Sequence, residues 1–188
     1  AGVGGALDMT AGSGAKGTGG AVTLTAGAGA SSSSGSITIK TVNAGTAGIS
    51  GLLVFSSGTT SKGNSGSVSV GTGTATGGNG GTITITVGNG NTNKGGDIVI
   101  AAGETTSTTG TGGRITLESG SGRFRTSGAI SIKSFNAGSA GVSGMLAFSS
   151  GTTSKGNSGV ISIGSGTATV GNGGRVSITV GSGTKNAG

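Results

Sequence analysis

The feature that most constrains this chain is a short signature, Gly-x-φ-x-φ with φ an apolar residue, which recurs about every fifteen residues. It first appears as Gly5-Ala6-Leu7-Asp8-Met9, and the same pattern then begins at Gly20, Gly35, Gly51, Gly66, Gly81, Gly96, Gly113, Gly128, Gly144, Gly159 and Gly174. A fixed short period is typical of architectures in which one unit cannot bury its apolar face alone and stacks on its neighbours. The period therefore predicts a stack of similar units.

A second, longer repeat contains the first. Residues 35–88 align without gaps on residues 128–181, and 38 of the 54 positions are identical. The longest identical run, Phe55 to Gly66, returns as Phe148 to Gly159. The chain is therefore interpreted as two tandem repeats of about 93 residues, 1–94 and 95–188, within one continuous body over 1–188, because the short period runs through the junction.

The apolar residues of the signature alternate with small or polar ones, which is strand patterning. We expect an all-β fold: a β-solenoid (parallel β-helix) of about twelve rungs of about fifteen residues, with a coil of about thirty-one residues as the alternative. The φ residues would face inward as two ladders. The first ladder is Leu7, Val22, Ile37, Leu53, Val68, Ile83, Ile98, Ile115, Ile130, Leu146, Ile161 and Val176, and the second is Met9, Leu24, Ile39, Phe55, Val70, Ile85, Ile100, Leu117, Ile132, Phe148, Ile163 and Ile178.

Composition argues against catalysis. The chain has no Cys and no His, which removes thiolate chemistry, the usual general base and the commonest metal ligands. The four acids are Asp8, Asp97, Glu104 and Glu118, and a solenoid would hold Asp8 and Asp97 six rungs apart, too far for a carboxylate pair. We therefore expect a protein that is not an enzyme and that has no catalytic, cofactor or metal site.

The net charge is +7, from eleven basic and four acidic residues. The bases are scattered, and Arg114, Arg123 and Arg125, with Phe124 among them, form the only cluster. Nucleic-acid binders usually concentrate charge and interleave aromatic residues. We interpret this charge as a source of solubility and of weak affinity for anionic polymers, with no specific nucleic-acid partner. The longest apolar stretch, Leu52 to Phe55, is too short to span a bilayer.

Two sets of apolar residues are predicted to make contacts between chains. With no cap visible on a solenoid, its open ends would pair head to tail, Leu7 and Met9 of one chain meeting Val176 and Ile178 of the next. The second set, for lateral contact, is Leu52, Val54, Met145 and Ala147, which would face outward beside the larger spacer residues Val42, Ile49, Phe135 and Val142. A locally thicker core is the other reading of this second set.

The pattern Gly-Gly-x-φ-x-φ, with Ser-Ser-Gly-Thr-Thr and Gly-Asn-Gly-Gly spacers, resembles the Gly/Ser/Thr-rich solenoid repeats of large surface or secreted proteins of algae and other protists. The resemblance covers the whole chain, rests on biased composition and implies an extracellular or cell-surface structural role without catalytic residues.

The expected function is thus a structural subunit of an extracellular filament, appendage or matrix fibre. Its partners would be further copies of itself in a head-to-tail homopolymer and extracellular polysaccharide. The alternatives are an ice-binding solenoid that uses outward rows such as Thr82, Thr84 and Thr86, and the stalk of a larger adhesin.

Overall fold

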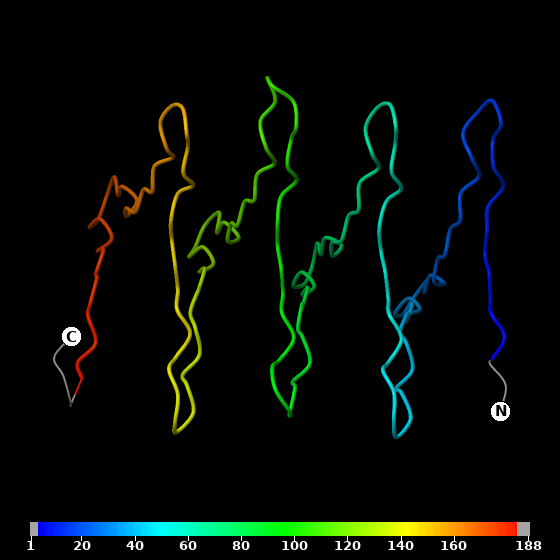
Figure 1. The fold of residues 1–188 in the computed structure, drawn as a ribbon, viewed down its shortest axis with the longest axis horizontal. Helices are drawn as coiled ribbons and strands as arrows, with labels where there is room; N and C mark the ends of the chain where they lie inside the picture. The colour runs from blue at the N-terminus through cyan, green and yellow to red at the C-terminus, as the bar shows by residue number, and fades with distance from the viewer. Residues whose placement is uncertain (1–3, 184–188) are drawn as a thin grey trace. The chain divides into compact units, whose positions relative to one another are not determined.

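The computed structural model describes residues 4–183, and over this range the backbone forms neither a helix nor a strand. Extended segments that carry the signatures alternate with turns (Figure 1). The predicted all-β solenoid is therefore wrong, because its rungs would have to pair as strands and these segments do not. A fifteen-residue and a thirty-one-residue coil are both excluded on the same ground.

The turns fall in the spacers between successive signatures. They occupy residues 15–17, 30–32, 46–48, 61–63, 76–78, 91–93, 108–109, 123–125, 139–141, 154–156 and 169–171. At each spacer the chain doubles back, so that the glycine that opens the next signature approaches a residue that lies nine to eleven positions earlier. A Cβ on Gly81, for example, would lie 3.1 Å from Cγ2 of Thr72, and one on Gly174 would lie 3.2 Å from Cβ of Ser165. The opening glycine thus permits a close approach at the base of the loop.

Two kinds of turn can be distinguished by their glycines. In the first kind, Ser or Thr is followed by any residue and then by a glycine with positive φ, as at Gly48, Gly63, Gly141, Gly156 and Gly171. The second kind follows the spacing Gly-x-Gly-x5-Gly. A backbone hydrogen bond closes its base, from Gly20 N to Gly12 O (2.8 Å), from Gly35 N to Gly27 O (2.9 Å) and from Gly128 N to Gly120 O (2.8 Å). We call the second kind closed loops.

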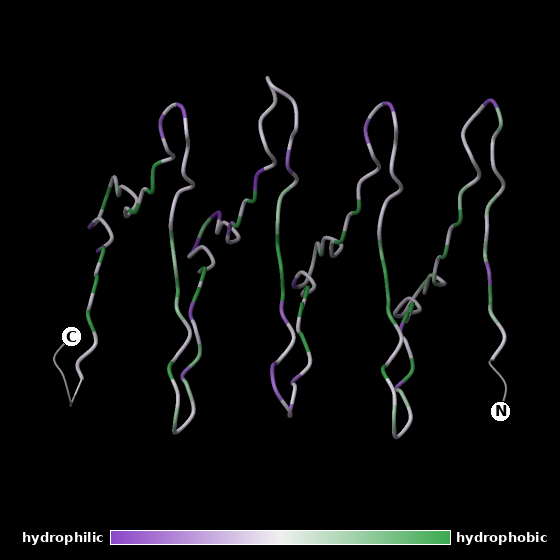
Figure 2. Cartoon of the chain, viewed as in Figure 1, coloured by the Kyte–Doolittle hydropathy of each residue, from purple (hydrophilic) through white to green (hydrophobic). Residues whose placement is uncertain are grey.

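The exposed area of the chain is far larger than that of a packed protein. It measures 18734 Å², whereas a folded chain of this mass is expected to expose roughly 7,700 Å² and an unfolded one about 24,700 Å². Among residues 4–183 no side chain is buried, and only Ala11, Ala26 and Thr105 are half-buried. The apolar segments recur along the chain (Figure 2), and all their large side chains are exposed.

The composition explains why the predicted interior does not form. Each spacing of about fifteen residues offers few large apolar side chains, two of them on the predicted inward face, and most of the wall opposite them would consist of Gly, Ala, Ser and Thr. The chain contains 48 glycines among 188 residues, and glycine loses more conformational entropy on ordering than any other residue. Little apolar area is therefore available to offset a large entropic cost.

The chain divides into two units, Ala1–Gly96 and Asp97–Gly188. This boundary lies two residues after the predicted end of the first sequence repeat at Lys94. Each unit has the same local character, with extended signatures and turns at matching positions. Gly48 and Gly141 have φ values of 147° and 156°, and Gly63 and Gly156 have 108° and 110°, so the second unit repeats the backbone conformations of the first at these turns.

Candidate binding surface

The predicted end contacts are all exposed. Leu7 is 88% exposed and Ile178 is 87% exposed, which makes each the most exposed member of its ladder. Met9 and Val176 are less exposed than these two, and Val176 is close to the typical member of the first ladder. The structure therefore presents both predicted ends to solvent, but no end of a stacked sheet exists for them to extend.

The predicted lateral set is also exposed, and it behaves alike in the two repeats. Leu52 is 85% exposed and its neighbour Leu53 is 47%, while in the second repeat Met145 is 86% and Leu146 is 49%. In these two pairs the residue that was expected to face outward is the more exposed, but Val54, also expected to face outward, is no more exposed than Phe55. The expected inward residue still has half of its surface in water, so the alternation describes local shielding and not an interior. A locally thicker core is excluded here, because neither the lateral set nor the larger spacer residues beside it are buried.

Two successive signatures of the second repeat line an apolar hollow of about 400 Å³ that is open to solvent. Phe148 of one signature and Ile161, Ser162 and Ile163 of the next line it. These residues flank the spacer that is identical in both repeats, and Phe55, Val68, Ser69 and Val70 hold the matching positions in the first repeat. The hollow has room for aliphatic side chains from a second chain.

The identical spacers form the same turn twice. The hydroxyl Oγ1 of Thr60 donates to the carbonyl oxygen of Lys62 at 3.1 Å, and Oγ1 of Thr153 donates to that of Lys155 at 3.0 Å. A positive-φ glycine follows each lysine. Each lysine therefore sits within a turn whose local geometry is set by the threonine before it and the glycine after it.

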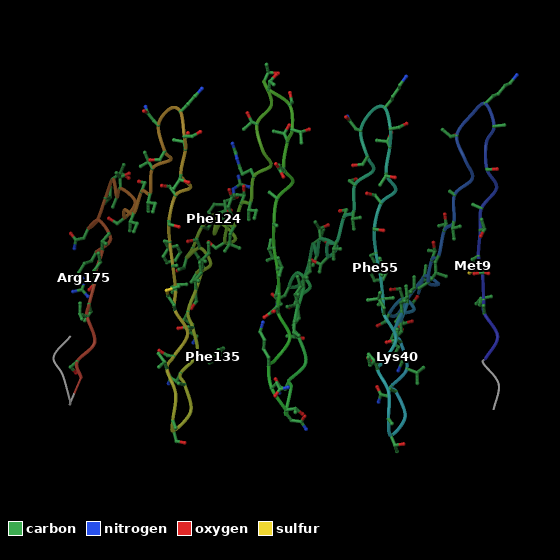
Figure 3. All side chains as sticks on the ribbon, viewed as in Figure 1. Met9, Lys40, Phe55, Phe124, Phe135 and Arg175 are labelled. Atoms are coloured by element: carbon green, nitrogen blue, oxygen red, sulfur yellow. The ribbon has the colours of Figure 1, made fainter. Side chains whose placement is uncertain are left out.

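The closed loop Gly120–Gly128 carries Arg123 and Arg125 of the basic cluster that the sequence singled out, and the third member, Arg114, lies before it. Arg123, Phe124 and Arg125 form its turn, and the guanidinium carbon of Arg123 lies 5.3 Å from the centre of the Phe124 ring. A little further along the chain, Nζ of Lys133 lies 5.7 Å from the centre of the Phe135 ring. Such distances allow cation–π attraction, which is weak at exposed sites. Figure 3 labels Phe124 and Phe135 on the second unit.

Sequence reasoning identified these arginines as a cluster but did not place them on a closed loop. The signal was present in the spacing Gly-x-Gly-x5-Gly. A Cβ on the middle glycine, Gly122, would meet the carbonyl oxygen of Arg125 at 2.5 Å and that of Thr126 more closely still. Gly29 and Gly14 are crowded in the same way by carbonyl oxygens of their own loops. The middle position accepts glycine alone.

A longer loop at 103–113 uses different chemistry to reach a similar closure. Gly113 N donates to Gly103 O at 2.9 Å, but this loop has Thr105 where the closed loops have a glycine. Here hydroxyls organise the turn: Ser107 N donates to Oγ1 of Thr105, and Thr109 N donates to Oγ of Ser107, both at 3.3 Å. Thr105 is half-buried as a result.

Other kinds of site are not seen in the part of the chain that the structure describes. Residues 4–183 contain no group of three or more acidic, His or Cys side chains placed to hold a metal ion. Over the same range, no helix has the length and apolar character needed to cross a bilayer.

Comparison with protein-family models, with curated protein sequences and with solved structures gave no match for this chain. The resemblance to algal and protist solenoid repeats thus remains a prediction from residue patterns.

Proposed function

We propose that this chain is a non-enzymatic structural protein, a subunit of an extracellular filament, appendage or matrix fibre, whose copies associate through their apolar ladders. One observation carries the proposal: all the large apolar side chains of residues 4–183 are exposed at regular spacing. Monomeric soluble proteins rarely expose large contiguous apolar surfaces. Covering such surface with a second chain is favourable by about 25 cal/mol for each Å² of apolar area removed from water.

Two contact sets are available for this association. In the head-to-tail mode, Leu7 and Met9 of one chain meet Val176 and Ile178 of the next, and a heterologous contact of this type generates open filaments. The high exposure of Leu7 and Ile178 favours this mode. The head-to-tail mode does not require stacked sheets, because the contact is between apolar side chains.

In the lateral mode, the contact set is Leu52, Val54, Met145 and Ala147. The near-equal exposure of Leu52 and Met145 favours this mode, since it presents the same feature once in each repeat. Chains joined at two such points would form sheets or bundles instead of single filaments. The apolar hollow beside Phe148 offers a place for one of these side chains.

The absence of Cys and His from the sequence supports a role without catalysis, because it removes the thiolate nucleophile and the side chain most often used as a general base. The extracellular assignment rests on the resemblance of the spacers to surface and secreted repeats. The ice-binding alternative needs threonines on a flat sheet face, and residues 4–183 form no such sheet. An adhesin stalk is the same structural role within a longer chain.

Sedimentation of the purified chain over a range of concentrations tests the proposal. We expect concentration-dependent polymers that negative-stain microscopy shows as filaments or bundles. Ile85→Asp places a charge in the second ladder, whereas the neighbouring Thr84→Asp makes the same charge change outside it. Ile85→Asp should reduce assembly more strongly. A chain that stays monomeric at all concentrations would overturn the proposal, and equal effects of the two variants would show that the second ladder outside the two contact sets takes no part in assembly.

The same assay separates the two modes. Leu7→Asp with Ile178→Asp should abolish head-to-tail filaments and spare lateral contacts, and Leu52→Asp with Met145→Asp should do the reverse. Thr10→Asp with Thr179→Asp is the matched control, because it makes the same charge change beside the ladders near both ends.

A further inference from the structure

We propose that the closed loop Gly120–Gly128 is a binding site for anionic polysaccharide, that is, for the carboxylate or sulfate groups of an acidic sugar polymer. The proposal does not depend on self-association of the chain. It rests on a comparison with the matching loop of the first repeat, Gly27–Gly35, which has the same closure and a different turn.

The two loops share one scaffold. Their closing bonds, Gly128 N to Gly120 O and Gly35 N to Gly27 O, measure 2.8 and 2.9 Å. Their middle glycines, Gly122 and Gly29, are both crowded by carbonyl oxygens from the far side of the turn. These two loops therefore close in the same way although their turns differ.

The turns differ in every residue. The first repeat has Ala30, Ser31 and Ser32, and the second has Arg123, Phe124 and Arg125 at the matching positions. The arginine content differs over the whole repeat as well. The first repeat contains no arginine, and all four arginines of the chain lie in the second.

The charge of the surrounding segment changes accordingly. Residues 114–125 carry Arg114, Arg123 and Arg125 against the single acid Glu118, a net charge of +2, whereas residues 21–32 carry no charged residue. Lys133 does not add to this difference, because Lys40 occupies the matching position in the first repeat. Two of the added cations, Arg123 and Arg125, therefore lie on this closed loop, and the matching loop of the first repeat has none.

The chemistry of arginine indicates the ligand. The guanidinium group presents a rigid fork of donors that matches an oxyanion with two parallel hydrogen bonds, and it is more weakly hydrated than an ammonium group. Two such groups on one short closed loop suit a polymer with a charge on each unit. A closed loop also has less freedom to lose on binding than an open one.

The aromatic residue favours a sugar polymer over a single-stranded nucleic acid. Proteins that bind single strands stack successive bases on several free aromatic faces. Here Phe124 is the one ring of the loop, and the guanidinium of Arg123 lies over it. The ring is 88% exposed but it is single, so the loop offers two cations and no row of aromatic faces for successive bases.

The experiment measures binding of dextran sulfate to the full chain, with neutral dextran of the same length as a control, by titration calorimetry at several salt concentrations. The test variant is Arg123→Ala, Phe124→Ser and Arg125→Ser, which installs the turn of the first repeat. We expect it to bind about ten- to thirtyfold more weakly, since each basic residue near an anionic surface contributes about one factor of five. The slope of log affinity against log salt should fall by about two, one for each lost cation.

Two control variants distinguish a site from bulk charge. Lys62→Ala with Lys155→Ala removes two cations from turns elsewhere and should weaken binding much less. Ala30→Arg, Ser31→Phe and Ser32→Arg should create a second site on the Gly27–Gly35 loop and raise the stoichiometry. Equal losses for the two charge-removing variants, no binding of dextran sulfate by the native chain, or stronger binding of poly(U) that displaces dextran sulfate would each overturn the proposal. Because the readout is binding by dilute chain, failure here leaves the self-association proposal standing.

Discussion

The closed loop Gly120–Gly128 and the turn that contains Gly156 lie in the same unit and depend on glycine for different physical reasons. In the closed loop, the middle glycine Gly122 lacks room for a Cβ because two carbonyl oxygens lie against it. At Gly156 there is open space around the Cα, but φ is 110°, a value that side chains of L-residues disfavour. One glycine is required by crowding and the other by conformation.

This difference shows which interactions hold the backbone conformation of a turn in a chain that lacks a core. Neither turn is held by packing, since the residues around both are exposed. The closed loop is held by one backbone hydrogen bond, and the other turn by the hydroxyl of Thr153 on the carbonyl of Lys155. Each turn should therefore respond to changes at its own glycine and bond and not to changes elsewhere.

The largest effect is expected for Gly122→Ala. The new Cβ would collide with the carbonyl oxygens of Arg125 and Thr126, which are backbone atoms and can move only with the turn. Forced overpacking of this kind typically costs about 1–3 kcal/mol, enough to open the loop. Amide exchange at Gly128, whose N–H closes the loop, should accelerate to the rate of an open chain. Gly120→Ala is the control, because a Cβ there meets nothing within 4 Å. Slow exchange in Gly122→Ala would show that the loop tolerates a Cβ at this position and does not require glycine there.

The next effect is expected for Gly63→Ala, which has open space but a φ of 108°. Holding alanine in this region costs about 1–2 kcal/mol, so the turn should relax to another conformation. Backbone chemical shifts of Lys62 and Gly63 should move, while those of Lys155 and Gly156 in the unchanged second repeat stay in place. Gly58→Ala, in the same spacer and with ordinary φ, should leave them unmoved. Equal shifts in the two variants would contradict the conformational explanation.

The sequence predicts where the chain turns but not whether its extended segments pair. The signature period indicates where the chain turns, because the spacers concentrate glycine, serine and threonine between apolar pairs. Alternation in residues such as Ile83 to Ile85 shows only that one face of an extended segment is more apolar than the other. It does not establish that the segment pairs with another, since pairing depends on long-range contacts whose entropic cost the glycine-rich wall does not offset.

The candidate sites were predictable to different degrees. Exposure of Leu52 and Met145 follows from alternation within a signature, and the structure has them more exposed than their neighbours. The interior of the ladders was predicted wrongly because it depended on pairing. The loop around Arg123 was missed as a structural unit, since a spacing of three glycines gives no hydrophobic periodicity; it becomes recognisable only through the crowding at Gly122.

A smaller effect is expected for Thr60→Val, which keeps the shape of the side chain and removes its hydroxyl. The bond from Oγ1 to the carbonyl of Lys62 is exposed, so its loss should cost about 0.5–1 kcal/mol. The carbonyl carbon of Lys62 should shift in the NMR spectrum, and that of Lys155, with Thr153 intact, should not. Thr60→Ser retains the donor and should resemble the native chain. A Val variant with an unchanged Lys62 carbonyl would show that positive φ at Gly63 suffices for the turn.

The smallest effect on backbone geometry is expected where side chains at a turn change and the glycines do not. Replacing Arg123, Phe124 and Arg125 with Ala, Ser and Ser gives the closed loop of the second repeat the turn of the first. Because both loops already close with bonds of 2.8 and 2.9 Å, amide exchange at Gly128 should change by less than twofold. The only lost contact within the loop is the exposed pairing of Arg123 with Phe124, which contributes roughly 0.5–1 kcal/mol at most. A large acceleration at Gly128 would mean that the pairing of Arg123 with Phe124 helps the bond from Gly128 N to Gly120 O to keep this loop closed, whereas the matching loop closes without such a pair.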